Sequence, residues 1–204
     1  MNQKKASFQG RSFQRLSFSP SNRVDFIVIK KRNCKLSSLF FFQRCCVHAP
    51  SSHFAATAYH SQGGLKDSIA NILATKEFVV SLATKKLIQQ VVQSSIDAPN
   101  NVDEFILMKL KKRKSRMVKP PSVAESPVSL ECRLLKKIDL KTTSTNKNQN
   151  KMIIGEVVGI HIDDKFIKNN KINSLAMRAI SRMGYTEYSE VDSRFLMERP
   201  KWGC

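Results

Sequence analysis

Hydrophobic and polar residues follow regular periods from Phe54 onward, and the first part of this region predicts a helix, a strand and a second helix. In segment 65–76 the apolar residues recur at helical spacing, at Leu65, Ile69, Ile72 and Leu73. Segment 77–83 is rich in β-branched and aromatic residues, which predicts a strand. The second helix is predicted from an N-cap at Thr84 to about Ser94, with an inward face of Leu87, Ile88, Val91 and Val92.

Two longer strands are predicted further along. Segment 126–135 alternates so that one face carries Val128, Leu130, Cys132 and Leu134. Segment 152–163 is the strongest strand of the chain, in which Gly155 and Gly159 mark a bulge or a close backbone approach. The polar segment 141–150 between them is expected to be a hairpin connection. Ser174 is predicted to cap a last helix that runs to about Arg182 and ends at Gly184.

These elements predict a mainly β fold with a few helices, an antiparallel barrel or sandwich, because strands outnumber helices and are separated by turns. The chain has 204 residues, enough for one domain with or without an appendage. No apolar run approaches the roughly 18 residues of a membrane span. The five cysteines form no CxxC and have no companion His spacing, so neither a disulfide framework nor a metal site is expected. A reducing, cytoplasmic location is expected.

The formal charge of +19 is distributed unevenly. Residues 1–53 hold ten Lys and Arg and a single acid, Asp25, for a net charge of +9. The segment 109–116 has six Lys or Arg in eight positions. That run is typical of a nucleic-acid patch or nuclear signal, or of a solvated connector at the edge of a sheet, and the connector is favoured. Pro120 and Pro121 then interrupt regular structure.

Three blocks late in the chain resemble a known family. They are Gly155-Glu-Val-Val-Gly-Ile-His-Ile-Asp-Asp, Met183-Gly-Tyr-Thr-Glu-Tyr and Phe195-Leu-Met-Glu-Arg-Pro. Upstream, Lys66-Asp-Ser-Ile-Ala-Asn-Ile with Glu77-Phe-Val-Val, and Val118-Lys-Pro-Pro-Ser-Val-Ala-Glu-Ser-Pro-Val, agree in order and spacing. Over residues 54–200 the chain resembles the flavin reductase-like family of FMN-binding split barrels. One departure is Ser81, where relatives commonly have Asn.

The resemblance implies a Greek-key-like split β-barrel that binds FMN near the interface of a homodimer and passes hydride from NAD(P)H to flavin. It places the phosphate of FMN at segment 61–68. The cofactor-binding candidates there are Ser61, Gly63, Gly64, Lys66 and Ser68. The glycines permit close backbone approach, Lys66 supplies positive charge, and helix amides can hold an anion. Asp67 is more naturally a cap for that helix. As a bare residue, Lys66 is an ordinary surface lysine.

Two further site residues are implied by the same resemblance. His161, between two isoleucines on a strand, is the candidate catalytic residue beside the flavin or the nicotinamide; by itself, a lone His in such a place is more often structural. Tyr185 matches a loop that approaches the active site in relatives, and as bare sequence it is a core aromatic residue. No metal is expected.

The first 53 residues do not resemble the start of the family, which reads approximately Arg-Pro-Ile-Ala-Trp-Ile-Ser and then Asn-Leu-Ala-Pro-Tyr-Ser-Phe-Phe-Asn-Ala-Val. They fit a transit peptide, because they are poor in acids and contain Arg and Ser. They also fit a disordered basic arm that binds nucleic acid. In that alternative the protein is a non-catalytic nucleic-acid-binding protein that acts through residues 1–53 and 109–116. A nucleic-acid partner is not favoured.

The favoured interpretation is a shifted reading frame. With suitable synonymous codons, segment 37–50 read one base later gives Ala-Pro-Tyr-Ser-Phe-Phe-Asn-Ala-Val, the family segment. We therefore expect about residues 20–52 to be out of frame, with 1–53 aberrant and 54–204 a split barrel truncated at its N-terminal strands. Such a barrel has unpaired edges, so the literal product is expected to bind FMN poorly or to be unstable.

Overall fold

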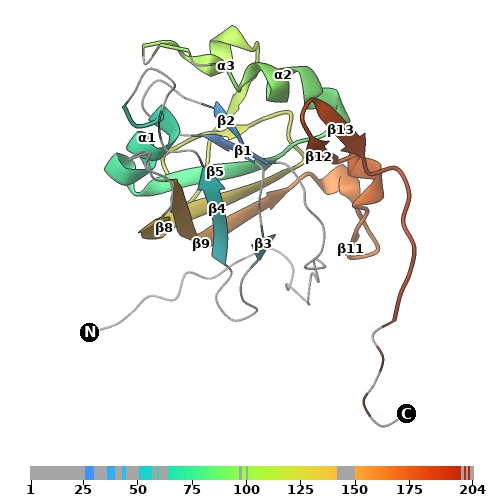
Figure 1. The fold of residues 1–204 in the computed structure, drawn as a ribbon. Helices are drawn as coiled ribbons and strands as arrows, with labels where there is room; N and C mark the ends of the chain where they lie inside the picture. The colour runs from blue at the N-terminus through green and yellow to red at the C-terminus, as the bar shows by residue number, and fades with distance from the viewer. Residues whose placement is uncertain are drawn as a thin grey trace.

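The structure, a computed structural model, describes most of the chain from Ser51 onward and three short backbone segments before it. The described residues are 26–29, 36–39, 43–44, 51–56, 59, 64–96, 98–99, 101–141, 150–198, 200 and 202. The main feature of this part is a seven-stranded sheet with the order β2-β1-β5-β8-β9-β4-β3 (Figure 1). All neighbouring strands in it are antiparallel. The mainly β fold with a few helices is thereby confirmed.

The large sheet contains β1 (Phe26–Ile29), β2 (Leu36–Leu39), β3 (Gln43–Arg44), β4 (Ser51–Ala56), β5 (Glu77–Leu82), β8 (Val128–Asp139) and β9 (Lys151–Ile162). Two-stranded sheets pair β6 (Lys112–Arg113) with β7 (Ser122–Val123), β10 (Ile167–Lys168) with β11 (Lys171–Ile172), and β12 (Ile180–Gly184) with β13 (Glu187–Glu190). The helical segments are α1 (Asp67–Thr75), η1 (Lys85–Leu87), α2 (Ile88–Gln93), α3 (Glu104–Leu107), η2 (Asp164–Phe166) and η3 (Leu175–Met177).

The predicted strands 126–135 and 152–163 are β8 and β9, which pair along their whole length. Their register shifts beside Gly155 and Gly159, as expected of these glycines. A Cβ at Gly155 would lie 2.4 Å from Cζ of Phe78, and one at Gly159 would lie 3.1 Å from Cγ of Met117. Both positions therefore allow another residue to approach the backbone of β9 closely.

Different parts of the chain cover the two faces of the β5–β8–β9 region. On one face, called the α1 face below, the predicted first helix packs two isoleucines into a buried cluster of Phe54, Ile69, Ile72, Phe78, Val80, Cys132 and Ile153. The rings of Phe54 and Phe78 meet edge to face, with centroids 5.9 Å apart. The opposite face, called the β6–β7 face below, is covered by residues 111–123, where Val123 N donates to Ser81 Oγ.

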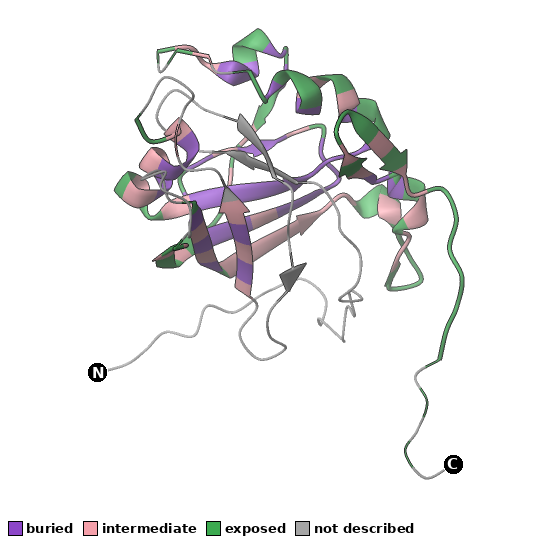
Figure 2. Ribbon diagram, in the orientation of Figure 1, coloured by how far each residue is buried: buried purple, intermediate pink, exposed green. Residues whose placement is uncertain are grey.

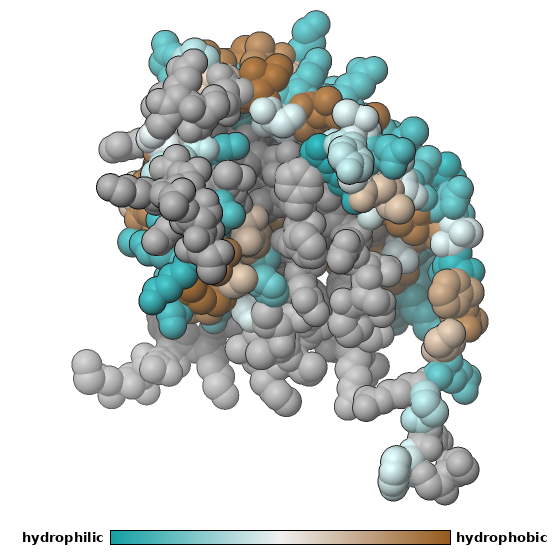
Figure 3. Space-filling model, viewed as in Figure 1, coloured by the Kyte–Doolittle hydropathy of each residue, from teal (hydrophilic) through white to brown (hydrophobic). Residues whose placement is uncertain are grey.

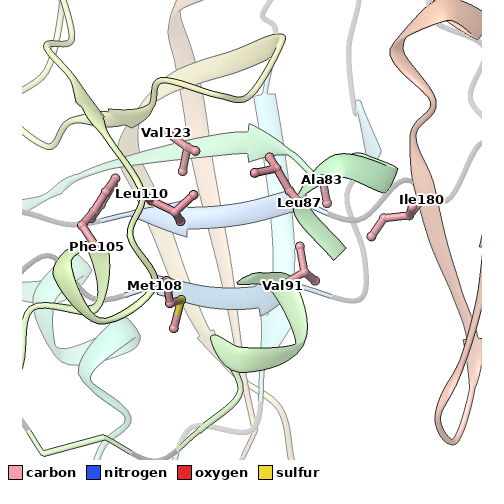
Figure 4. Packing of buried hydrophobic residues seen from close by; sticks show 8 residues of the cluster. All are labelled: Ala83, Leu87, Val91, Phe105, Met108, Leu110, Val123 and Ile180. Atoms are coloured by element: carbon pink, nitrogen blue, oxygen red, sulfur yellow. The ribbon is translucent and has the colours of Figure 1, made fainter. Parts of the chain in front are cut away.

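A second core lies beneath α2 and α3 (Figure 4). Its buried members are Ala83, Leu87, Val91, Phe105, Met108, Leu110, Val123 and Ile180. The predicted second helix supplies two of them, although it is divided into η1 and α2, and Val92, expected to face inward, is 47% exposed. Thr84 precedes this helix without a side-chain capping bond. Burial is greatest along the central strands and least on α2, α3 and the C-terminal segment (Figure 2).

The helix predicted from Ser174 to Arg182 is wrong. Only one turn forms there, η3, and Arg178 ends it with a φ of +52°. The chain then enters β12, where Ile180 N donates to Ala83 O and the Ile180 side chain enters the core beneath α2. Burial of Ile180 and pairing with β13 therefore override the local helical pattern.

Residues before 54 contribute to the large sheet. β1 pairs with both β2 and β5, and β3 pairs with β4, which itself crosses the expected domain boundary at residue 54. The sheet therefore contains backbone from the segment in which a shifted frame is predicted. The frame hypothesis concerns the coding DNA, and it stays a prediction, as does the boundary itself. No helix in the described part of the chain has the length and apolar character that crossing a membrane requires.

Candidate functional site

The segment before α1 carries the predicted phosphate-binding residues. Gly64 is exposed and has a φ of +81°, a conformation that glycine adopts without steric cost. Lys66, at the N-cap position, is half-buried, and its carbonyl oxygen accepts hydrogen bonds from Ile69 N at 2.8 Å and Ala70 N at 3.0 Å. Ser68 lies in the first turn and is 5% exposed. Ser61 and Gly63 lie outside the described residues.

The N-terminus of α1 has no side-chain cap. The first amides of a helix have no intrahelical acceptor, and together with the helix dipole they favour an anion. Lys66 adds a positive charge, and the hydroxyl of Ser68 is engaged in none of the hydrogen bonds of the described residues. Asp67 in the first turn opposes a dianion. The donor set of amides, ammonium and hydroxyl fits the phosphate of FMN.

On the β6–β7 face, Arg113 is the centre of a polar network. Its Nε donates to Ser122 Oγ and its Nη2 to Ser129 Oγ, both at 3.0 Å. The hydroxyl of Ser129 lies 3.1 Å from that of Ser81, and both serines are buried. Burial lowers the pKa of Arg113, and the largest opposing influence is the charge of Asp163. Arg113 is therefore a structural part of this face, although sequence reasoning favoured a solvated connector for segment 109–116.

The buried carboxylate of Glu131 holds the backbone of residues 116–118 on the sheet. Glu131 is 7% exposed and accepts hydrogen bonds from the amides of Arg116 at 3.0 Å, Met117 at 2.6 Å and Val118 at 3.2 Å. Such charge-assisted bonds are about twice as strong as neutral ones. The side chain of Met117 approaches Gly159, where an added Cβ would lie 3.1 Å from its Cγ, so this loop lies over β9.

His161 shares the β6–β7 face with Arg113, because it pairs with Ser129 across the two strands. Its side chain is half-buried. The pKa of His161 is lowered, first by burial and then by the positive charges of Arg113 and Arg116, against the attraction of Asp163 and Asp164. Burial and the two arginines thus favour the neutral form of the imidazole.

The structure does not bring the predicted site residues together within one chain. Lys66 and Ser68 lie at the start of α1, on the α1 face, whereas His161 lies on the β6–β7 face, so the sheet separates them. Tyr185 is 93% exposed at the tip of the β12–β13 hairpin, not in a core. Figure 1 shows this hairpin and α1 at opposite sides of the molecule.

Sequence reasoning missed Arg113 and Glu131. Arg113 is one of six cations in an apparently uniform run, and nothing in the run distinguishes it. Glu131 gave a weak signal, because it is the acid in an otherwise apolar and small strand segment, 128–132. Ser81, the departure from the family, has a clear role as the partner of Ser129 and Val123. Among the described residues, no cluster of His, Cys, Asp or Glu is placed to hold a metal ion.

An antiparallel β domain with an uncapped, cationic helix start is a fold and site suited to a bound phosphate group. The model of the flavin reductase like domain matches residues 11–176. The chain therefore belongs to the flavin reductase-like domain family. The match ends within η3, so β12, β13 and the residues after them lie beyond the matched domain.

Individual proteins are similar to this chain in sequence or in fold. An uncharacterized protein of Aquifex aeolicus (strain VF5) is 31% identical over 125 residues, which span 61% of this chain and 60% of that protein. The solved structure of nitrilotriacetate monooxygenase component B from Bacillus cereus has a TM-score of 0.76 at 21% identity, covering 85% of this chain and 86% of its own. The solved structure of a flavin reductase with a split barrel domain from Shewanella frigidimarina NCIMB 400 has a TM-score of 0.72 at 18% identity. The match covers 88% of this chain and 86% of that chain. The split-barrel fold is thus shared.

Proposed function

We propose that this chain binds FMN and transfers hydride from NAD(P)H to the flavin as a homodimer. The observation that carries the proposal is the uncapped start of α1, with Lys66 and Ser68, in a chain of the flavin reductase-like family. FMN, when bound, supplies the ring that accepts the hydride. The protein supplies the anchor for the phosphate, the orientation of the ring and protection from water.

Lys66, Ser68 and the first amides of α1 hold the phosphate in this proposal. Gly64, with its positive φ, turns the chain into the helix and leaves the approach to these amides open, because a Cβ there would have nothing within 4 Å. Ser61 and Gly63, in the same loop by sequence, are assigned to the same phosphate.

His161 stands beside the reacting ring in this proposal. A neutral imidazole can donate or accept a hydrogen bond without placing a positive charge beside the nicotinamide. The sheet separates His161 from Lys66 in one chain, so we assign one flavin to the Lys66 of one protomer and the His161 of the other. The exposed Tyr185 is assigned to this shared site as well.

Binding of FMN to the full chain tests the phosphate anchor. Lys66→Gln and Ser68→Ala are each expected to weaken FMN binding about tenfold, measured by quenching of flavin fluorescence, because each removes one contact to an anion. Lys86→Gln, an exposed lysine on η1, is the control and should bind FMN like the parent. Riboflavin lacks the phosphate, so equal affinity for riboflavin and FMN would contradict the assignment.

Mixing variants tests the shared site. His161→Asn is expected to lower the rate of flavin bleaching by NADH or NADPH under anaerobic conditions while FMN affinity stays unchanged. A Lys66→Gln/Ser68→Ala chain should be inactive at low FMN. Mixed dimers of the two variants contain one intact site, so the mixture should regain a large part of the activity. A mixture no more active than its components would contradict the shared site.

A further inference from the structure

The chain after β13 leaves the body of the molecule. Val191 N donates to Ala179 O at 2.8 Å, the last backbone hydrogen bond to the body among the described residues. No hydrogen bond joins residues 192–198 to another described residue. Figure 1 shows this segment running away from the sheet in an extended conformation. Residues 191–198 and Trp202 are called the C-terminal arm below.

The C-terminal arm exposes an unusual amount of apolar surface. Phe195 is 84% exposed, Leu196 95%, Met197 84% and Trp202 105%. Single exposed apolar residues are ordinary on protein surfaces, but three consecutive large ones are not. The hydrophobic effect favours a state in which this segment is covered.

A second apolar surface is exposed on another side of the molecule, on and next to α2 and α3. This α2–α3 patch consists of Val92, Ile96, Ile106 and Leu107, which are 47%, 59%, 76% and 53% exposed. Figure 3 shows apolar atoms gathered at the top of the molecule, where Figure 1 places α2 and α3, while the C-terminal arm extends downward on the right. The arm therefore points away from the patch of its own chain.

We propose that the C-terminal arm docks on the α2–α3 patch of a second copy of this chain. From its anchor at Val191 the arm runs away from the patch of its own chain. In a two-fold dimer each arm reaches the patch of the other copy, so both exposed surfaces are covered and the assembly closes.

The area involved is sufficient for a stable dimer. An aromatic side chain buries about 150–250 Å², so Phe195 and Trp202 alone give roughly 300–500 Å² on each arm. With the matching surface of the patch and two arms, the total reaches roughly 1,200–2,000 Å², the size of a specific interface.

The inference deepens the homodimer of the proposed function by naming the segment that joins the two copies. The arm lies beyond residues 11–176, the part matched by the family domain. Arm docking can therefore fail while flavin binding and a homodimer of another kind both stand.

Sedimentation of the full chain and its variants tests the inference. Phe195→Glu/Met197→Glu on the arm and Ile106→Glu/Leu107→Glu on the patch are each expected to raise the dimer dissociation constant at least about 100-fold, because buried anchors dominate interface energy. Leu135→Glu, at a residue 59% exposed on β8, is the matched control and should leave the constant unchanged.

Trp202 gives a second readout, because it is the single tryptophan of the chain. Its emission should be shifted to shorter wavelength in the dimer and should move to longer wavelength on dilution and in both Glu variants. A dimer that persists in the arm variant, with Trp202 emission unaffected by dilution, would overturn arm docking and leave the homodimer intact. A monomeric parent chain would overturn both, and a concentration-independent blue shift in a monomer would show docking within one chain instead.

Discussion

Arg113 donates a hydrogen bond from Nη2 to the hydroxyl of Ser129, 3.0 Å away. Because Ser129 on β8 pairs with His161 on β9, this bond joins the loop that covers the β6–β7 face to the part of the sheet that holds His161. Its Nε bond to Ser122 fixes the same guanidinium to β7. One cation of the basic run is thus fixed between two strands while its neighbours Lys111 and Lys114 are exposed. This arrangement makes Arg113 both a stabilising contact and a source of positive charge near His161.

Arg113→Met is expected to lower the free energy of unfolding by about 1–3 kcal/mol, because the hydroxyls of the buried Ser129 and Ser122 lose a donor. Urea unfolding followed by circular dichroism measures the change. Lys114→Met, one residue away and exposed, is the control and should change stability by less than about 0.5 kcal/mol. Equal effects of the two substitutions would show that the network of Arg113 contributes nothing specific.

His161 is expected to make stability depend on pH. Its pKa is lowered in the folded state, so below the unfolded value of about 6.5 the unfolded chain binds a proton that the folded chain does not. Stability is therefore full above that value and falls as the pH drops through it toward the folded pKa. His161→Asn should flatten this decline, which urea midpoints between pH 7.5 and 5 will measure.

The same titration connects His161 to Arg113. Burial is the main cause of the lowered pKa and Arg113 is the next. Arg113→Met should therefore raise the pKa of His161 part of the way toward its ordinary value, as followed by NMR of the imidazole protons. An unchanged or further lowered pKa would contradict the proximity of the two groups.

The strands were predictable from the sequence where a buried face repeats at regular intervals. Val128, Leu130 and Cys132 share the α1 face because each packs against residues of the core, and the period of two follows directly. The helix predicted after Ser174 failed for the opposite reason. Ile180 is buried by distant partners such as Ala83, and the local pattern contains no trace of that contact.

Sequence analysis pointed only to the α1 part of the candidate site. Lys66 and Ser68 are candidates there because segment 61–68 resembles the phosphate-binding loop of the family, and they are near neighbours in the sequence. The network around His161 joins residues 113, 129 and 161. These residues are brought together by strand pairing, so their spacing along the chain does not predict the network. The exposure of Tyr185 likewise depends on the β12–β13 hairpin, whose first strand lies in the segment that the sequence predicts to be the end of a helix.

Cys132 is expected to be unreactive in the folded protein. Burial raises the pKa of its thiol to about 12, and its sulfur lies 3.6 Å from the hydroxyl of Ser52. The thiolate that reacts with iodoacetamide is therefore almost absent at neutral pH. Peptide mapping by mass spectrometry should find Cys132 unmodified in buffer and fully modified in denaturant. Modification of Cys132 in buffer at the rate found in denaturant would contradict its place in the core.

Gly155→Ala is expected to destabilise the fold by about 2–3 kcal/mol, because the new methyl group would lie 2.4 Å from Cζ of Phe78 in the centre of the α1 face. Gly159→Ala is the matched comparison, since its nearest neighbour is the flexible side chain of Met117 at 3.1 Å, and it should cost less. Phe78→Leu removes the obstructing ring, so the double variant with Gly155→Ala should be more stable than the two separate costs predict. Strict additivity in that double-mutant cycle, measured by urea unfolding, would mean that the two residues do not contact each other.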